Sequence, residues 1–116
     1  MALVQISQAQ GRIPVTVFHL QDRVNLGNFA ELEEAAKEAY NNGMRDLVID
    51  LSQTPSLTSI GVRALVIIHK MLSAEDRGKH LKLANPIPAI RDMLDISGVT
   101  EYVEVYDSLE QAVASY

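Results

Sequence analysis

The segment that most constrains the fold is Arg45–Leu51, with the sequence RDLVIDL. Its apolar residues form an almost continuous run, which is typical of a strand covered on both faces in a parallel sheet. Amphipathic helical patterns lie on either side of it, at Asn28–Asn42 and Ser59–Asp76. Because neighbouring parallel strands need helical crossovers of this kind, the segment predicts an α/β domain with Arg45–Leu51 as a central strand.

Further strands are expected before and after this segment. Val4–Ser7 and Ile13–Leu20 are rich in β-branched residues and are separated by Gly11, which predicts an antiparallel pair. His80–Ala84 alternates apolar and polar residues and predicts a strand parallel to Arg45–Leu51. The remaining expected elements are a short helix at Pro86–Ile96, a last strand at Tyr102–Tyr106 and a terminal helix with Leu109, Ala112, Val113 and Tyr116 on one face.

Capping patterns mark the expected helix ends. Asn28 is followed three residues later by Glu31, and Asp107 by Glu110, so each pair predicts a side-chain cap at the start of a helix. Gly43 stands where it can close the first helix.

The long helix expected at Ser59–Asp76 has two apolar stripes. One stripe holds Val62, Leu65, Val66 and Leu72, and the other holds Ala64, Ile67, Ile68 and Met71. Apolar surface therefore nearly encircles the helix, which indicates either burial on two sides or one face presented to a partner.

The composition favours one domain over residues 1–116. The chain has 116 residues, 47% of them hydrophobic, which is enough for a core without disulfides or metals, and it contains no Cys. Its formal net charge of −5 lacks the basic field that drives binding to phosphate backbones, so we expect no nucleic-acid partner.

Targeting and membrane signals are not recognisable in the sequence. The first residues, MALVQISQAQGR, have neither the basic head nor the apolar stretch of a secretory signal. The longest strongly apolar run, Ala64–Ile68, is far shorter than the ~20 residues that span a bilayer. We expect a cytoplasmic protein with no direct membrane insertion.

The histidines and acidic residues show no familiar spacing of a metal or catalytic site. His19, His69 and His80 have no acidic or Cys companion at ligand spacing, so we interpret them as structural and expect no metal. Asp46 and Asp50 flank the central strand, and solvation of the strand ends explains them.

Enzyme motifs are equally hard to find. The chain has six Gly and neither a Gly-rich phosphate loop nor a Gly-x-Ser-x-Gly turn. We recognise no converging set of nucleophile, base and oxyanion donors. We therefore expect no cofactor, no catalytic residue and no turnover of nucleotide or ester by the protein alone.

The turn TPSLTSIG, at Thr54–Gly61, has the most unusual content. In open α/β sheets, ligands gather beyond the carboxyl ends of the strands, where this turn is expected to lie. Thr58 or Ser59 is expected to cap the following helix. One of these hydroxyls could also accept a phosphoryl group, which a helix N-terminus favours, and both roles can hold together.

The run DLVIDLSQTPSLTSIGVRALVIIHK, starting at Asp46, resembles the signature of the STAS domain family of bacterial anti-sigma-factor antagonists. In that signature a strand ending in Asp-Leu-Ser leads through a loop to Asp-Ser-Ser-Gly-Leu at the start of a long helix. Leu20–Leu32, LANPIPAIRDMLDISGV and VYDSLEQAV extend the resemblance over nearly the whole chain. It implies an α/β domain with a mixed sheet of four or five strands and about four helices.

The resemblance can be followed residue by residue through the turn. The phosphorylated Ser of the family falls on Ser59, its Gly on Gly61 and the following Leu on Val62, while its second Ser is Ile60 here.

Two acidic positions of the family are neutral in this chain. Thr58 stands in place of the Asp before the phosphorylated Ser, and Asn25 in place of an Asp in the loop before the first helix, where Asn28 is retained. In the family these carboxylates lie near the switch and help partner or kinase recognition.

The resemblance implies a non-enzymatic antagonist that binds an anti-sigma factor with serine-kinase activity and is switched off by phosphorylation at Ser59, less readily at Thr58. The expected partner-binding residues are Asn25, Asn28, Thr58, Ser59, Gly61, Val62, Arg63, Val66 and Lys70. One alternative is a non-phosphorylated STAS scaffold subunit of a stress-signalling or lipid-transport assembly, which the changes at Thr58 and Asn25 favour. Others are a module that binds a nucleotide or another small ligand, and an enzyme; homodimerisation stays open.

Overall fold

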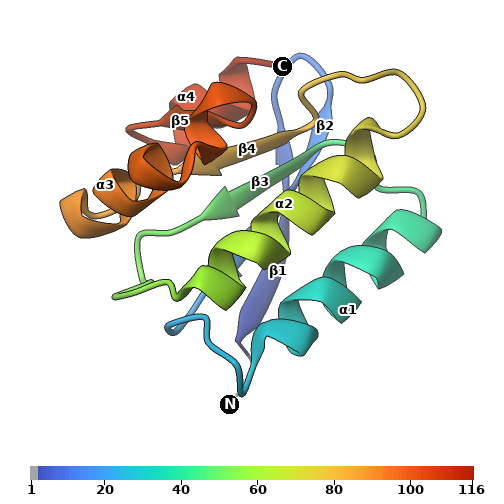
Figure 1. The fold of residues 1–116 in the computed structure, drawn as a ribbon. Helices are drawn as coiled ribbons and strands as arrows, with labels where there is room; N and C mark the ends of the chain where they lie inside the picture. The colour runs from blue at the N-terminus through green and yellow to red at the C-terminus, as the bar shows by residue number, and fades with distance from the viewer. Residues whose placement is uncertain (1–2) are drawn as a thin grey trace.

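The computed structural model describes residues 3–116, and the predicted strands form a single sheet in it (Figure 1). The strands are β1 (Val4–Gln10), β2 (Pro14–Leu20), β3 (Leu47–Asp50), β4 (Leu81–Ala84) and β5 (Glu104–Tyr106). Their order in the sheet is the order in the sequence, with β1 antiparallel to β2 and the other neighbours parallel. The predictions of an antiparallel pair and of a central β3 parallel to β4 are confirmed.

The helices cover both faces of this sheet. They are α1 (Phe29–Asn41), α2 (Ser59–Ser73), α3 (Pro88–Ser97), which a short 3-10 turn at Val99–Glu101 follows, and α4 (Leu109–Ala114). Successive right-handed crossovers in one direction put α1, α2 and α3 on the same face, and α4 returns to the other. The predicted α/β class with a mixed sheet is confirmed. No helix within residues 3–116 is long and apolar enough to cross a membrane.

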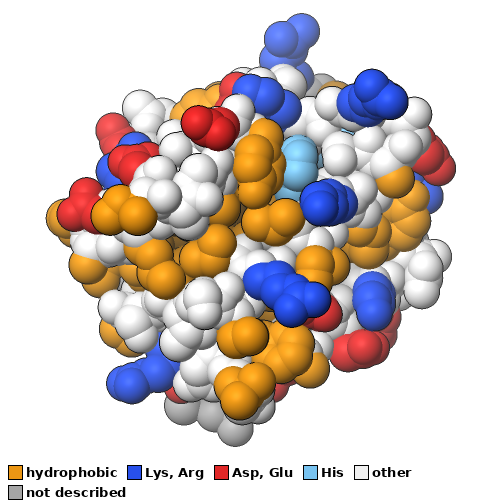
Figure 2. Space-filling model, in the orientation of Figure 1, with side chains coloured by type: hydrophobic (Ala, Val, Ile, Leu, Met, Phe, Trp, Pro, Cys, Tyr) orange, Lys and Arg blue, Asp and Glu red, His pale blue; other side chains and the backbone are white. Residues whose placement is uncertain are grey.

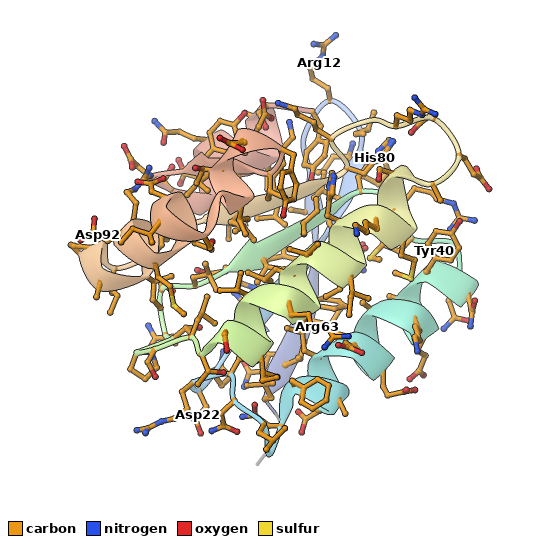
Figure 3. All side chains as sticks on the ribbon, viewed as in Figure 1. Arg12, Asp22, Tyr40, Arg63, His80 and Asp92 are labelled. Carbon is orange, nitrogen blue, oxygen red and sulfur yellow. The ribbon has the colours of Figure 1, made fainter. Side chains whose placement is uncertain are left out.

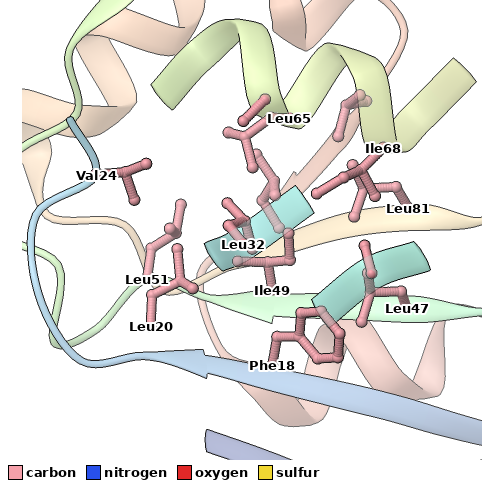
Figure 4. Close-up of a cluster of buried hydrophobic side chains, with 14 of the residues drawn as sticks. Phe18, Leu20, Val24, Leu32, Leu47, Ile49, Leu51, Leu65, Ile68 and Leu81 are labelled. Carbon is pink, nitrogen blue, oxygen red and sulfur yellow. The ribbon is translucent and has the colours of Figure 1, made fainter. Parts of the chain in front are cut away.

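The larger core lies between the sheet and helices α1 to α3. Alternation along the strands directs Phe18 and Ile49 toward these helices, where they meet Leu32 of α1 and Leu65 of α2 (Figure 4). All four side chains are fully buried. The continuous apolar run of β3 is explained by Val48, which is also fully buried but belongs to the second core under α4.

The last turn of the chain is held to the second face by a buried lysine. Lys82 is 5% exposed, and its Nζ lies 2.8 Å from Ser115 Oγ, 3.2 Å from Glu104 Oε1 and 4.2 Å from the centre of the Tyr116 ring. The Tyr116 hydroxyl lies within hydrogen-bond distance of two backbone carbonyls at the starts of β3 and β4. Burial raises the pKa of this hydroxyl, so it is a hydrogen-bond donor throughout the accessible pH range.

The predicted cap of α1 is wrong in its side-chain bonds. The helix does begin after Asn28, but the Asn28 side chain forms no cap hydrogen bond. The Glu31 carboxylate accepts a hydrogen bond from the backbone N–H of Leu3 instead of reaching back to Asn28. Gly43 follows the helix in a left-handed conformation, φ +107°, which explains why the helix closes there.

The predicted cap of α4 is displaced by one residue. Ser108 Oγ accepts a hydrogen bond from Gln111 N at 3.1 Å, so Ser108 is the N-cap. Asp107, the expected cap, pairs with Arg91 at 2.8 Å.

His80 lies just before β4 between two carboxylates. Its Nδ1 is 2.7 Å from Asp46 Oδ1 and its Nε2 is 2.8 Å from Asp76 Oδ1. Asp76 also accepts a hydrogen bond from Gly78 N, and this turn ends α2 at Ser73, earlier than predicted. The hydrogen bond with Asp46 has the largest effect on the pKa of His80. Together with the hydrogen bond to Asp76 it outweighs burial, which lowers the pKa, so the pKa of His80 is raised.

We expect the free energy of unfolding to decrease as pH rises through the raised pKa of His80. A folded-state pKa above the ordinary 6.5 means that the fold favours the protonated ring, so this contribution is complete below about pH 6.5 and is lost above the folded-state pKa. Urea unfolding at about pH 6 and pH 8.5 measures it, and the decrease should be smaller in His80→Gln than in the wild type. His69→Gln is the control. Burial lowers the pKa of His69, so the contribution of His69 to the free energy of unfolding increases as pH rises, opposite to that of His80. An equal decrease in His80→Gln and the wild type would contradict the prediction.

Candidate functional site

The loops after β2 and β3 meet at the carboxyl ends of these strands. Val24 N donates to Ser56 O at 3.3 Å and Thr58 N donates to Val24 O at 3.1 Å, while Val24 and Leu57 pair as a short parallel bridge. Residues 21–28 and 51–58 therefore form one continuous surface, called here the two-loop surface. This is the end of the sheet at which the sequence predicted a functional turn.

Helix α2 begins at this surface with two adjacent hydroxyls that have different roles. Thr58 is the N-cap: its Oγ1 lies 3.4 Å from Gly61 N, whose hydrogen bond it accepts, and 3.2 Å from Val24 O, to which it donates. Ser59 is the first helical residue and is exposed, and its hydroxyl forms no hydrogen bond within residues 3–116. The expected cap is therefore Thr58 alone, and the Ser59 hydroxyl is available for chemistry.

Gly61 lets α2 approach the two-loop surface closely. A Cβ atom at this position would lie 3.1 Å from Val24 Cβ, 3.2 Å from Val24 O and 3.3 Å from Leu57 Cδ2. These distances are tighter than ordinary van der Waals contacts, and one of the neighbours is backbone.

We expect Gly61→Ala to lower the free energy of unfolding by about 1–2 kcal/mol through overpacking against Val24. The sign of this change in stability is informative, because in an unconstrained helix interior Ala is favoured over Gly by about 1 kcal/mol and the substitution would stabilise the fold. Gly27→Ala is the control, since the nearest atom there is a side-chain oxygen of Asn25 at 3.3 Å, and its effect should stay within about 0.5 kcal/mol. Denaturant unfolding measures both variants, and increased stability of Gly61→Ala would contradict the proposed close approach.

The loop before α1 is shaped by its own asparagines. Asn28 Oδ1 accepts from Asn25 N at 2.9 Å, and Asn28 Nδ2 donates to Arg23 O at 2.8 Å. Asn25 Oδ1 accepts from Gly27 N at 2.9 Å. This arrangement leaves the side chain of Leu26 73% exposed on the two-loop surface.

The outer face of α2 combines basic and apolar side chains. Arg63 and Lys70 are exposed, and Ile67 is 37% exposed between them (Figure 3 labels Arg63). A hollow of about 200 Å³ separates this face from α1, lined by Phe29, Glu33, Ile60, Arg63 and Ile67. Figure 2 shows basic and hydrophobic side chains interspersed over this side of the molecule. Such a surface suits a protein partner that carries acidic groups around an apolar contact.

The residues predicted to bind a partner divide into three groups. Thr58, Ser59, Arg63 and Lys70 are exposed, and Asn25, Asn28 and Val66 are half-buried. Gly61 and Val62 are buried, and Val62 belongs to the main core, so neither presents a side chain to solvent. Leu26, Phe29 and Ile60 also lie on this surface but were not predicted, although a lone Leu between Asn25 and Gly27 in a polar loop was a usable signal.

Two of the three histidines have acidic partners, contrary to the sequence analysis. His19 pairs with Asp50 and His80 with Asp46, partners that lie 31 and 34 positions away along the chain. Solvation of strand ends therefore does not explain Asp46 and Asp50. Within residues 3–116, no group of three or more His, Cys, Asp or Glu is arranged to hold a metal ion.

Comparison with known proteins identifies relatives of the whole domain. The family model described as STAS domain matches residues 6–112. BtrV of Bordetella bronchiseptica, provisionally assigned as an anti-sigma factor antagonist, is 31% identical over 97 residues, which are 84% of this chain and 82% of BtrV.

Solved structures share the fold at lower identity. A provisionally assigned anti-sigma factor antagonist from Thermotoga maritima has a TM-score of 0.86 at 18% identity, covering 97% of this chain and 92% of its own. The cell fate determinant SpoIIAA of Bacillus, in its phosphorylated form, has a TM-score of 0.71 at 17% identity and covers 97% of both chains.

Proposed function

The chain belongs to the STAS domain family, and we propose that it is a cytoplasmic anti-sigma factor antagonist whose binding to an anti-sigma factor with serine-kinase activity ends when Ser59 is phosphorylated. The observation that carries this proposal is the exposed Ser59 hydroxyl at the first turn of α2, where Thr58 already provides the cap. A kinase can therefore reach a hydroxyl that the fold does not use. The phosphorylated structure of SpoIIAA, a protein of similar fold, also supports it.

A phosphate on Ser59 would leave α2 intact. The first turn of α2 contains no acidic residue, and the N-terminal backbone N–H groups and the helix dipole favour an anion by about 0.3–1 kcal/mol. Arg63 follows Ser59 by four residues, the spacing at which side chains are neighbours on a helix. The switch in this proposal therefore acts on the partner contact and does not unfold the helix.

The neutral residues beside Ser59 sharpen this switch. Thr58 and Asn25 stand where the family carries carboxylates, so the unmodified turn is less negative than in typical relatives. Phosphate adds about −1.5 to −2 charges at neutral pH. An acidic partner surface that fits Arg63 and Lys70 would then face repulsion and desolvation where it had attraction.

The test is phosphorylation by the cognate anti-sigma kinase with ATP, followed by peptide mass spectrometry. We expect phosphate on Ser59, with Thr58 as the lesser acceptor, so Ser59→Ala should lose most of the modification and keep at most a minor fraction on Thr58. Ser56→Ala, which removes another exposed serine of the same loop, is the matched control and should be phosphorylated like the wild type. Modification that persists in Ser59→Ala would move the switch elsewhere, and partner binding without any phosphorylation would favour the scaffold alternative.

A further inference from the structure

Ser7, His19 and Asp50 form a chain of hydrogen bonds on the sheet face opposite α1 and α2. They come from β1, β2 and β3, which lie side by side (Figure 1). Ser7 Oγ is 2.9 Å from His19 Nε2, and His19 Nδ1 is 2.8 Å from Asp50 Oδ2. His19 and Asp50 are direct partners in the register of β2 and β3, so the sheet itself fixes this pair.

The hydrogen-bond partners fix the direction of each bond. Burial alone would raise the pKa of Asp50, but hydrogen bonds from Ser52 and His19 outweigh it and lower that pKa. Asp50 is therefore a carboxylate, which only accepts, and His19 must carry a proton on Nδ1. In the neutral ring Nε2 is then the acceptor, and Ser7 donates its hydroxyl proton to it.

The serine is open to solvent beside a backbone donor. Ser7 is exposed, because α4 packs mainly on β3, β4 and β5, and the residue of β1 that packs against the second core is Ala9. Gln21 N donates to Leu3 O, so these two residues form a hydrogen-bonded pair of the antiparallel strands. Hydrogen-bonded and non-hydrogen-bonded pairs alternate along β1 and β2, which makes Gln8 and Thr16 a non-hydrogen-bonded pair. The N–H of Gln8 therefore points away from β2. This N–H belongs to the residue after Ser7 and lies on the free edge of the sheet.

We propose that Ser7 is an activated serine that accepts an acyl group from activated esters or thioesters, with His19 as its general base and Asp50 as the positioning residue. Ser7 Oγ forms a bond to the acyl carbon while its proton moves to His19 Nε2. The ester or thioester bond then breaks, and the leaving alcohol or thiol takes that proton. The N–H of Gln8 is placed to stabilise the oxyanion. This site is independent of Ser59 and of the proposed anti-sigma partner. It departs from the expectation that no nucleophile, base and oxyanion donor converge in this chain, because the three residues come from separate strands that only the sheet brings together.

The experiment uses 4-nitrophenyl acetate and peptide mass spectrometry of the wild-type protein. Ester adducts are separated from lysine amides by their loss in alkaline hydroxylamine, which amides resist. We expect an ester adduct on Ser7 that forms at least about tenfold faster than on Ser56 or Ser59, which are exposed serines without a histidine partner within residues 3–116. This comparison within one folded protein needs no variant. Equal rates at the three serines would overturn the proposal.

Three variants test the assigned roles. Ser7→Ala should lose the adduct on that peptide. His19→Gln should slow acylation of Ser7 at least about tenfold, because the general base is lost. Asp50→Asn, which keeps the side-chain size but permits the other tautomer of His19, should slow acylation and alter the pH profile. An unchanged rate and pH profile in His19→Gln would also overturn the proposal.

Discussion

Ser59→Asp is expected to lower the affinity for the anti-sigma factor at least about 100-fold, equivalent to about 2.7 kcal/mol, while Ser59→Ala binds like the wild type. The asymmetry follows from the position of Ser59, because its hydroxyl forms no hydrogen bond within residues 3–116 and its loss costs the fold nothing. A carboxylate at the first turn of α2 should keep the melting temperature within about 2 °C of the wild type, since the helix dipole favours it. Calorimetric titration and thermal unfolding measure the two quantities.

Ser56→Asp is the control for this experiment. It adds the same charge to an exposed position of the same loop, three residues before Ser59. We expect it to weaken binding much less than Ser59→Asp. Equal effects of the two substitutions would indicate general repulsion, and equal affinity of Ser59→Asp and the wild type would remove the switch from Ser59.

Ile49→Ala is expected to produce the largest loss of stability, about 2–4 kcal/mol. Ile49 is fully buried in the central strand, between Phe18 of β2 and Leu83 of β4, so a cavity would form where three elements meet. Ile6→Ala removes the same atoms from a side chain that is 54% exposed and should cost less than about 0.5 kcal/mol. Urea unfolding of both variants measures the difference, and similar losses would contradict the central burial of β3.

The sequence predicted best those features that depend on local pattern. The apolar run of Arg45–Leu51 predicted the central strand because only burial on two faces tolerates such a run, and the structure confirms it. The turn Thr54–Gly61 was predicted because its unusual content follows the expected central strand, at the end of the sheet where ligands gather. The structure places it at the carboxyl end of β3, beside the loop that follows β2.

Features that depend on long-range contacts could not be predicted in this way. By residue type Ser is a better helix cap than Thr, yet Thr58 is the cap, because its hydroxyl also donates a hydrogen bond to Val24 O from another loop. Val62 and Ile67 both belong to apolar stripes of α2, but only the packing of the sheet decides that Val62 is buried and Ile67 is partly exposed.

The matching order of strands in the sheet and in the sequence has a consequence for how the molecule assembles. β1 and β2 pair as a hairpin, and each strand from β3 onward joins the edge formed by its predecessor, so the sheet can grow laterally by one helix and one strand at a time. No later strand has to insert between two that are already paired. The parallel pairings, such as Phe18 with Ile49 and Ile49 with Leu83, each close a long crossover, whose entropic cost grows only slowly with its length. The chain is therefore expected to fold without a topological rearrangement, at the moderate rate of a mixed α/β domain.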